Sequence, residues 1–161
     1  MREFDQRTTS FTEEDVMAKL YAIPHKGRSD EEIAFDINQN TPPFPLKVQI
    51  QTSTRCNAAC AMCPYPEITG EPGFVHKLMD EELYLSIIDQ MVGKGVQRLA
   101  LFLMNEPLLD KRLPKWLSIA KEKLPETQLI LFSNGSALTE KMLFGIADGG
   151  LDELNVSVHG F

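Results

Sequence analysis

The chain has 161 residues, which is enough for one domain of ordinary size or for part of a larger one. Apolar residues make up 43% and charged residues 24%, a composition typical of soluble globular proteins that excludes a disordered or fibrous chain. The net charge of −7 argues against nucleic acid as a partner, and the sequence has neither a run of roughly 20 apolar residues to span a bilayer nor an apolar secretion signal at its start.

Residues 1–45 are predicted to form a polar N-terminal extension with two short helices. One helix follows Thr12, where acidic residues suit the positive end of a helix dipole. The other starts at Ser29, because Ser29 and Glu32 have the spacing of a capping box. The proline-rich segment 41–45 then predicts an extended linker, since proline stops a helix.

Residues 46–161 alternate between strand and helix patterns. Period-two or continuous apolar runs predict strands, and apolar residues spaced for one face predict helices. This alternation predicts an α/β fold with a parallel sheet and right-handed crossovers. The predicted strands are 46–52, 97–104, 128–133 and 154–159, and the predicted helices are 80–92, 113–124 and 139–147.

Two of these strands carry one polar face, which is unusual for parallel strands covered on both sides. The polar residues are Lys47, Gln49 and Gln51 in the first strand and Asn155, Ser157 and His159 in the last. A sheet curled into a barrel around a wet, ligand-holding lumen explains the pattern, and so does an edge strand with one face in solvent. Lys47 and His159 are accordingly open to either a substrate-binding or a structural interpretation.

The three cysteines, Cys56, Cys60 and Cys63, follow the first strand with C-x3-C-x2-C spacing. An odd number of cysteines in so short a segment excludes a secreted disulfide framework and indicates a reducing compartment. One loop with this spacing can aim three sulfurs at a common point. Three thiolates can hold three irons of a [4Fe-4S] cluster and leave the fourth iron open to a substrate or cofactor.

The alternative for the cysteines is a structural zinc site in a non-catalytic βα binding domain. Zinc usually takes four ligands, so Cys56, Cys60 and Cys63 would need a histidine, for which His76 is the candidate. A further alternative is that the cysteines only pack in the interior, as free cysteines often do.

Residues outside the cysteine motif indicate a known family. Arg55 and Asn57 flank the first cysteine, and Met62 precedes the third. The segment Asn105-Glu106-Pro107 resembles a Gly-Gly-Glu(-Pro) motif, Ser133-Asn134-Gly135 a Thr-Asn-Gly motif, and 156–160 a Ser-Ile-Asp-Gly motif. With the cysteines, these segments make residues 46–161 resemble the radical SAM superfamily.

The resemblance implies a partial (βα) barrel with a [4Fe-4S] cluster held by the three cysteines and S-adenosylmethionine (SAM) on its open iron. It implies that Glu106 accepts a hydrogen bond from the methionine amino group, that Ser133, Asn134 and Ser157 contact the ribose or the methionine carboxylate, and that the Met62 backbone meets the adenine. Asn105 replaces a usual glycine, so its side chain either crowds the methionine or adds a polar contact. The resemblance implies no particular catalytic side chain.

The implied reaction is reductive cleavage of SAM to a 5′-deoxyadenosyl radical, which abstracts hydrogen from a substrate. The class is therefore an oxidoreductase or a transferase that needs a low-potential electron donor of the flavodoxin or ferredoxin type. The Cys-x-Met-Cys-Pro form resembles the SPASM-type branch, whose members modify peptides or proteins or act on small molecules. The superfamily closes six βα units and this chain carries about four strands, so we expect an apparently truncated, N-terminal part of a longer enzyme.

Overall fold

The computed structural model describes residues 27–158, which fall into two compact units divided between Leu46 and Lys47. In the first unit, helix α2 (Asp30–Asn40) begins with the expected capping box: Ser29 and Glu32 each accept the other's backbone N–H through their side chains. The helix ends where the Thr41 N–H donates to the Ile37 carbonyl, ahead of the prolines. The helix expected after Thr12 lies outside the described residues.

The second unit is built on a parallel sheet of four strands in the order β1-β2-β3-β4. This confirms the predicted α/β class and parallel topology. Only β3 has its predicted bounds. The strands are β1 (Lys47–Gln49), β2 (Arg98–Ala100), β3 (Gln128–Ser133) and β4 (Glu153–Val156).

The predicted strand 97–104 was too long at its carboxyl end, for a visible reason. Beyond Ala100 the backbone donors leave the sheet ladder: the Leu103 N–H bonds to the Asn105 side chain, and the Met104 N–H bonds to the Gln51 side chain. These side chains replace strand partners and turn the chain toward the end of β1. The apolar run therefore indicated burial correctly, but not ladder pairing.

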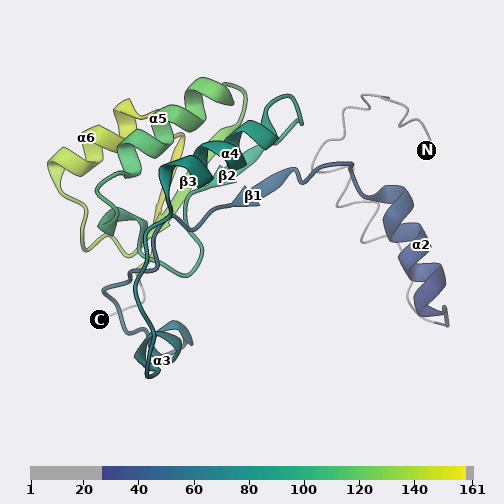
Figure 1. Ribbon diagram of the computed structural model, residues 1–161, viewed down its shortest axis with the longest axis horizontal. Helices are drawn as coiled ribbons and strands as arrows, with labels where there is room; N and C mark the ends of the chain where they lie inside the picture. The colour runs from purple at the N-terminus through teal and green to yellow at the C-terminus, as the bar shows by residue number, and fades with distance from the viewer. Residues whose placement is uncertain (1–26, 159–161) are drawn as a thin grey trace. The chain divides into compact units, whose positions relative to one another are not determined.

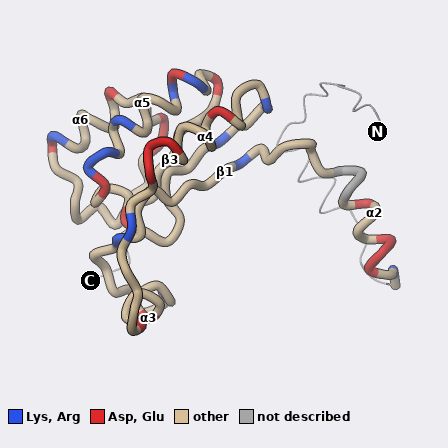
Figure 2. The backbone as a smooth tube through the Cα atoms, in the orientation of Figure 1, with Lys and Arg blue, Asp and Glu red and all other residues tan. Residues whose placement is uncertain are grey.

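Three helices lie together on one face of the sheet (Figure 1): α4 (Glu81–Met91), α5 (Leu113–Lys123) and α6 (Glu140–Asp148). Their boundaries match the predictions to within two residues. Leu99, Leu129 and Leu131 on the sheet are fully buried, as are Trp116 and Leu117 on α5. Acidic and basic residues recur along these helices (Figure 2), and the side chains that pair between α4 and α5, Lys115 with Glu81 and Lys123 with Asp89, are exposed. Burial of this apolar layer is the main stabilising term for the unit.

The opposite face of the sheet is more polar. Parallel register aligns Arg98 with Gln128, and the Arg98 side chain donates to Gln128 and forms an ion pair with Glu153 at 3.3 Å. Asn155 donates to the same Glu153 carboxylate at 2.7 Å. These side chains are partly exposed, so this face offers charges and amides rather than a sealed core.

Two short elements were not predicted. Helix α3 (Tyr65–Gly70) follows the cysteines, and the 3-10 helix η1 (Pro107–Leu109) follows Glu106. Both are too short to show a helical period in the sequence. They matter because each fixes a part of the candidate site.

Candidate functional site

The cysteines lie in a long loop that leaves the carboxyl end of β1 and carries α3 at its far end (Figure 1). The two sides of the loop pair at its base, which we call the neck. There the Met79 N–H donates to the Thr52 carbonyl at 2.8 Å, the Thr54 N–H donates to the Lys77 carbonyl at 3.0 Å, and Ser53 forms an antiparallel bridge. Barrel enzymes build their sites at this edge of the sheet.

Cys56, Cys60 and Cys63 are free, half-buried thiols. A turn joins the last two, with the Cys63 N–H donating to the Cys60 carbonyl at 2.9 Å. Across residues 27–158 no group of three or more His, Cys, Asp or Glu side chains stands close enough together to hold a metal ion. The structure therefore places all three thiols in one loop without gathering their sulfurs into a ligand set.

Tyr65, at the start of α3, anchors the loop from inside. Its ring is 7% exposed, and its hydroxyl donates to the Thr54 carbonyl at 2.7 Å while accepting from the Gln51 amide at 3.3 Å. This role was not predicted, because a tyrosine between two prolines shows no periodicity. The contact holds the segment after the cysteines against the end of β1.

Glu106 is buried in the segment between β2 and η1, where it connects three parts of the chain. Its backbone N–H donates to the Arg55 carbonyl in the cysteine loop at 2.9 Å. One carboxylate oxygen, Oε1, accepts from Ser133 Oγ at 2.7 Å and from the Leu108 N–H at 3.0 Å, and Oε2 accepts from the Asn134 N–H at 2.7 Å. Three residues predicted for the site, Glu106, Ser133 and Asn134, thus lie together, and Oε2 keeps a lone pair for another donor.

Asn134 also reaches the cysteine loop directly. Its side-chain amide donates to Asn57 Oδ1 at 2.9 Å, and the Asn57 amide donates to Ser136 Oγ at 2.8 Å. Asn57 follows Cys56, so the end of β3 is bonded to the loop beside the first cysteine. The role of Ser136 was not predicted, since a serine after Gly135 reads as an ordinary turn residue.

The remaining predicted residues are less closely connected. Asn105 is 8% exposed; its side-chain oxygen accepts the Leu103 N–H, and its amide nitrogen has no hydrogen-bond partner. Met62 is 69% exposed. Ser157 is half-buried, and its backbone N–H donates to the Ser133 carbonyl at 2.8 Å. His159 lies outside the described residues.

Asp110 and Arg112 form an ion pair at 2.9 Å that the sequence did not indicate. The Asp110 side chain is 1% exposed. Burial by itself would raise the pKa of Asp110, but hydrogen bonds from Arg112 and Thr52 outweigh it, and the pKa lies below its usual value. The carboxylate is therefore held charged beneath the loop neck.

His76 does not join the cysteines. Its Nδ1 lies 2.9 Å from the Thr54 carbonyl oxygen, and its ring meets Phe74 edge-on at 5.2 Å. A zinc site would need the His76 imidazole beside the three thiols. Within residues 27–158, no three His, Cys, Asp or Glu side chains gather closely enough to hold a metal ion. His76 instead contributes to the loop neck.

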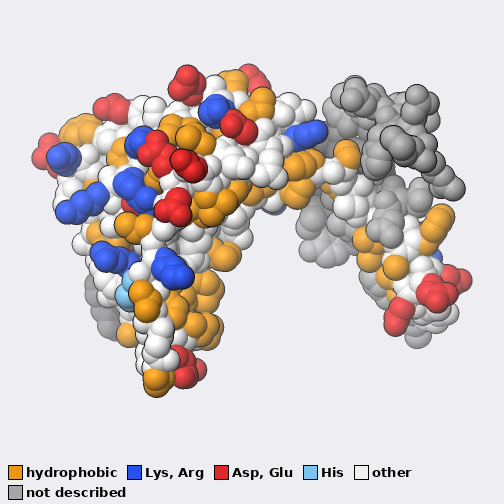
Figure 3. All heavy atoms as spheres, in the orientation of Figure 1, with side chains coloured by type: hydrophobic (Ala, Val, Ile, Leu, Met, Phe, Trp, Pro, Cys, Tyr) orange, Lys and Arg blue, Asp and Glu red, His pale blue; other side chains and the backbone are white. Residues whose placement is uncertain are grey.

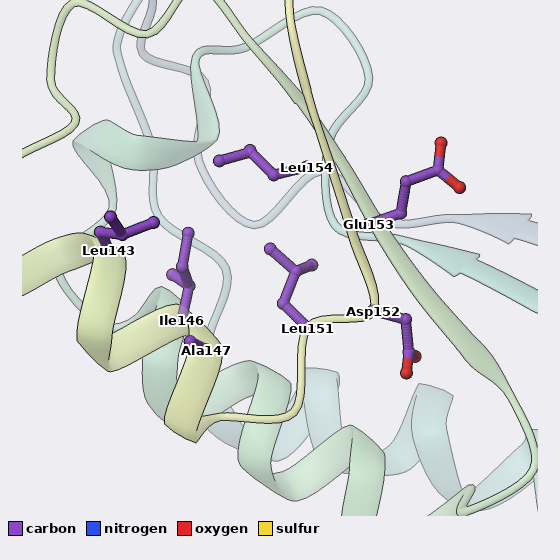
Figure 4. A pocket seen from close by; sticks show the side chains of 7 residues that line it. All are labelled: Leu143, Ile146, Ala147, Leu151, Asp152, Glu153 and Leu154. Carbon is purple, nitrogen blue, oxygen red and sulfur yellow. The ribbon is translucent and has the colours of Figure 1, made fainter.

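Exposed apolar side chains accompany the cysteine loop (Figure 3): Met62, Ile68, Val75 and Leu78 are all about half exposed or more. A separate apolar hollow lies between α6 and β4 (Figure 4), where Leu143, Ile146, Leu151 and Leu154 line the space while Asp152 and Glu153 point away from it. None of the predicted site residues lines this hollow. It is thus distinct from the site around Glu106.

Known proteins resemble the chain over this same region. The family model of the radical SAM superfamily matches residues 50–161. A SAM-dependent 2-deoxy-scyllo-inosamine dehydrogenase of Niallia circulans is 28% identical over 117 residues, covering 70% of this chain and 44% of that protein. A PqqA peptide cyclase of Xanthomonas oryzae pv. oryzae (strain MAFF 311018) is 31% identical over 118 residues, covering 73% of this chain and 30% of that protein.

The crystal structure of BtrN in complex with AdoMet and 2-DOIA has a TM-score of 0.66 at 24% identity, covering 75% of this chain and 48% of that one. This likeness shows the fold, and it agrees with the predicted portion of a partial barrel. The chain belongs to the radical SAM superfamily. It spans less than half the length of the curated relatives named above.

The superfamily uses a [4Fe-4S] cluster and SAM. The donor set here fits these groups, because thiolates are the usual ligands of iron–sulfur clusters and three of them leave one iron open. The unpartnered buried amide of Asn105 fits as well, since a buried donor without an acceptor is costly unless a ligand supplies one. None of the helices in the described part of the chain has the length and apolar character that a bilayer crossing needs.

Proposed function

We propose that the chain is the cluster- and SAM-binding part of a radical SAM enzyme. The observation that carries the proposal is the bonding of the cysteine loop to the ends of β2 and β3, through the Glu106 N–H to Arg55 and through Asn134 to Asn57. When bound, a [4Fe-4S] cluster of this kind supplies the electron that splits SAM into methionine and a 5′-deoxyadenosyl radical, which takes a hydrogen atom from the substrate.

In this proposal Cys56, Cys60 and Cys63 hold the cluster. Glu106 orients the amino group of the methionine through the free lone pair of Oε2, and the Asn105 amide donates to the methionine carboxylate. The further contacts to SAM come from Met62, Ser133, Asn134 and Ser157. The domain division is part of the same proposal: residues 1–45 are an extension with a linker, and 46–161 are the N-terminal portion of the barrel.

We infer that the substrate is a small polar molecule rather than a peptide. The support is the name of the dehydrogenase relative, which indicates a small polar substrate for that protein. That relative is named for an amine-bearing cyclitol. Arg98, Gln128 and Glu153 give no support, because each begins its strand and they lie at the amino ends, away from the cysteine loop. A peptide substrate, as the name of the cyclase relative indicates for that protein, is the second candidate.

The reaction needs an electron donor, for which a flavodoxin- or ferredoxin-type protein has the required low potential. An oxygen-sensitive cluster also favours the cytoplasm as the compartment. Both inferences depend on the cluster, and both would be wrong if the chain binds no cluster.

The experiment that tests the proposal is anaerobic reconstitution with iron and sulfide, followed by metal analysis and electron paramagnetic resonance after dithionite reduction. We expect about four irons per chain, a signal that changes on adding SAM, and 5′-deoxyadenosine as a product. Cys60→Ser should lose the cluster, and His76→Ala, which changes a residue of the loop neck, should keep it. Stoichiometric zinc that depends on His76 would overturn the proposal in favour of a structural zinc site.

A further inference from the structure

A single guanidinium, that of Arg112, bonds to both sides of the neck of the cysteine loop. Arg112 donates through Nη1 to the Met79 carbonyl at 2.8 Å and through Nη2 to the Thr52 carbonyl at 3.2 Å. These two carbonyls belong to opposite sides of the neck, whose strands also bond to each other. One planar side chain therefore joins the chain entering the cysteine loop to the chain leaving it.

Asp110 holds that guanidinium in place. Its carboxylate accepts from Arg112 Nε at 2.9 Å, Arg112 Nη2 at 2.9 Å and the Arg112 backbone N–H at 3.0 Å, and it also accepts from Thr52 Oγ1 at 3.0 Å. Trp116, which is fully buried, lies under the guanidinium with 4.9 Å between Arg112 Cζ and the ring centroid. Few rotamers of Arg112 satisfy all these contacts at once.

The pair also connects the neck to the other half of the site. Asp110 follows η1 directly, and η1 begins after Glu106, whose side chain caps it through the Leu108 N–H. A shift of Asp110 would therefore move a segment that starts at Glu106. Arg112 and Asp110 thus hold the cysteine loop in a fixed position relative to the segment that follows β2.

We propose that Asp110 and Arg112 are positioning residues that hold the neck of the cysteine loop at a fixed place relative to Glu106. The inference rests on the proposed function, because the loop is positioned for the cluster and SAM. Lysine cannot replace Arg112, since an ammonium lacks the planar fork that reaches two carbonyls and a carboxylate together. The competing interpretation is an ion pair that only stabilises the fold.

Hydrogen exchange on the metal-free full chain separates the two interpretations. Arg112→Lys should speed exchange of the neck amides of Thr54, Lys77 and Met79 by about tenfold or more while the amides of β3 change less than about twofold. The control is Lys115→Gln on α5, which removes the exposed ion pair with Glu81 and the approach of Lys115 Nζ to the Trp116 ring at 5.7 Å but leaves every hydrogen bond of Arg112 and Asp110 in place. Unchanged neck amides, or equal acceleration in the neck and in β3, would overturn the proposal.

Cluster retention tests the positioning role itself. After reconstitution and exposure to a chelator, Arg112→Lys and Asp110→Asn should lose iron about tenfold faster than the wild type and show an altered paramagnetic signal with SAM, whereas Lys115→Gln should match the wild type. Equal retention and equal signals in all chains would overturn the positioning role alone. A wild-type chain that binds no iron would overturn the proposed function, and the positioning role with it.

Discussion

Replacing Glu106 by glutamine tests the bonding that organises the site. Glutamine keeps one oxygen, which can still accept from Ser133 Oγ and the Leu108 N–H as Glu106 Oε1 does. Its amide nitrogen then faces the Asn134 N–H, where Oε2 now accepts at 2.7 Å, so two donors meet. Loss of one hydrogen bond to a charged acceptor predicts destabilisation by about 2 kcal/mol.

The assay is urea unfolding of the metal-free full chain, so that the result reports the fold rather than the cofactors. Glu122→Gln on the exposed face of α5 is the matched control and should lie within about 0.5 kcal/mol of the wild type. Ser133→Ala should cost about 1 kcal/mol, and the double variant with Glu106→Gln should show coupling between the two sites.

A free energy of unfolding for Glu106→Gln equal to that of the control would refute the reasoning. It would mean that the buried carboxylate contributes nothing through the Asn134 N–H. The end of β3 would then owe its position to the sheet alone, and the site would lose the connection on which the proposed function depends.

Three further predictions concern single residues. Gly135→Ala should destabilise the fold by about 1–3 kcal/mol in urea unfolding, because Gly135 has φ +74° and an added Cβ would lie 2.9 Å from Val156 Cγ1. The control Gly70→Ala should be nearly neutral, because its added Cβ would meet no atom within 4 Å. The stability advantage of wild type over Asp110→Asn should be full above about pH 4 and shrink as the pH falls through the lowered folded-state pKa of Asp110; a difference independent of pH from 3 to 6 would contradict this. Asn105→Ala should weaken SAM binding about tenfold in calorimetry without loss of iron, because the unpartnered amide is the donor we assign to SAM; an unchanged affinity would place that amide outside the SAM site.

Sequence patterns predicted the helices and strands that are long enough to show a hydrophobic period. Helix α6 begins at Glu140, one residue after the predicted start, because Thr139 is its N-cap and accepts the Met142 N–H through Oγ1. Strand β3 has an uninterrupted run and the predicted bounds. Strands β1, β2 and β4 are shorter than predicted. For β2 the reason is visible, because the Asn105 and Gln51 side chains take the N–H groups of Leu103 and Met104 beyond its end.

The site was predicted in part. Motif resemblance identified Glu106, Ser133 and Asn134, and the structure brings these three together. Their actual partners are one another and backbone N–H groups, which no motif specifies. Asp110 and Arg112 could not be found, because their partners Thr52 and Met79 are distant in sequence and meet only once the neck has formed.

The contacts of the cysteine loop indicate where its position is determined. Arg55 is bonded to the Glu106 backbone after β2, Asn57 to Asn134 after β3, and the neck to Arg112 before α5. Because parallel strands end at one edge of the sheet, the segments after β2 and β3 can both bond to one loop, while the long side chain of Arg112 reaches its neck. Substitutions at the ends of β2 and β3 should therefore disturb cluster binding even when they touch no cysteine. On the proposed function, the position of the cysteine loop is set by these contacts at the edge of the sheet as well as by the sequence of the loop.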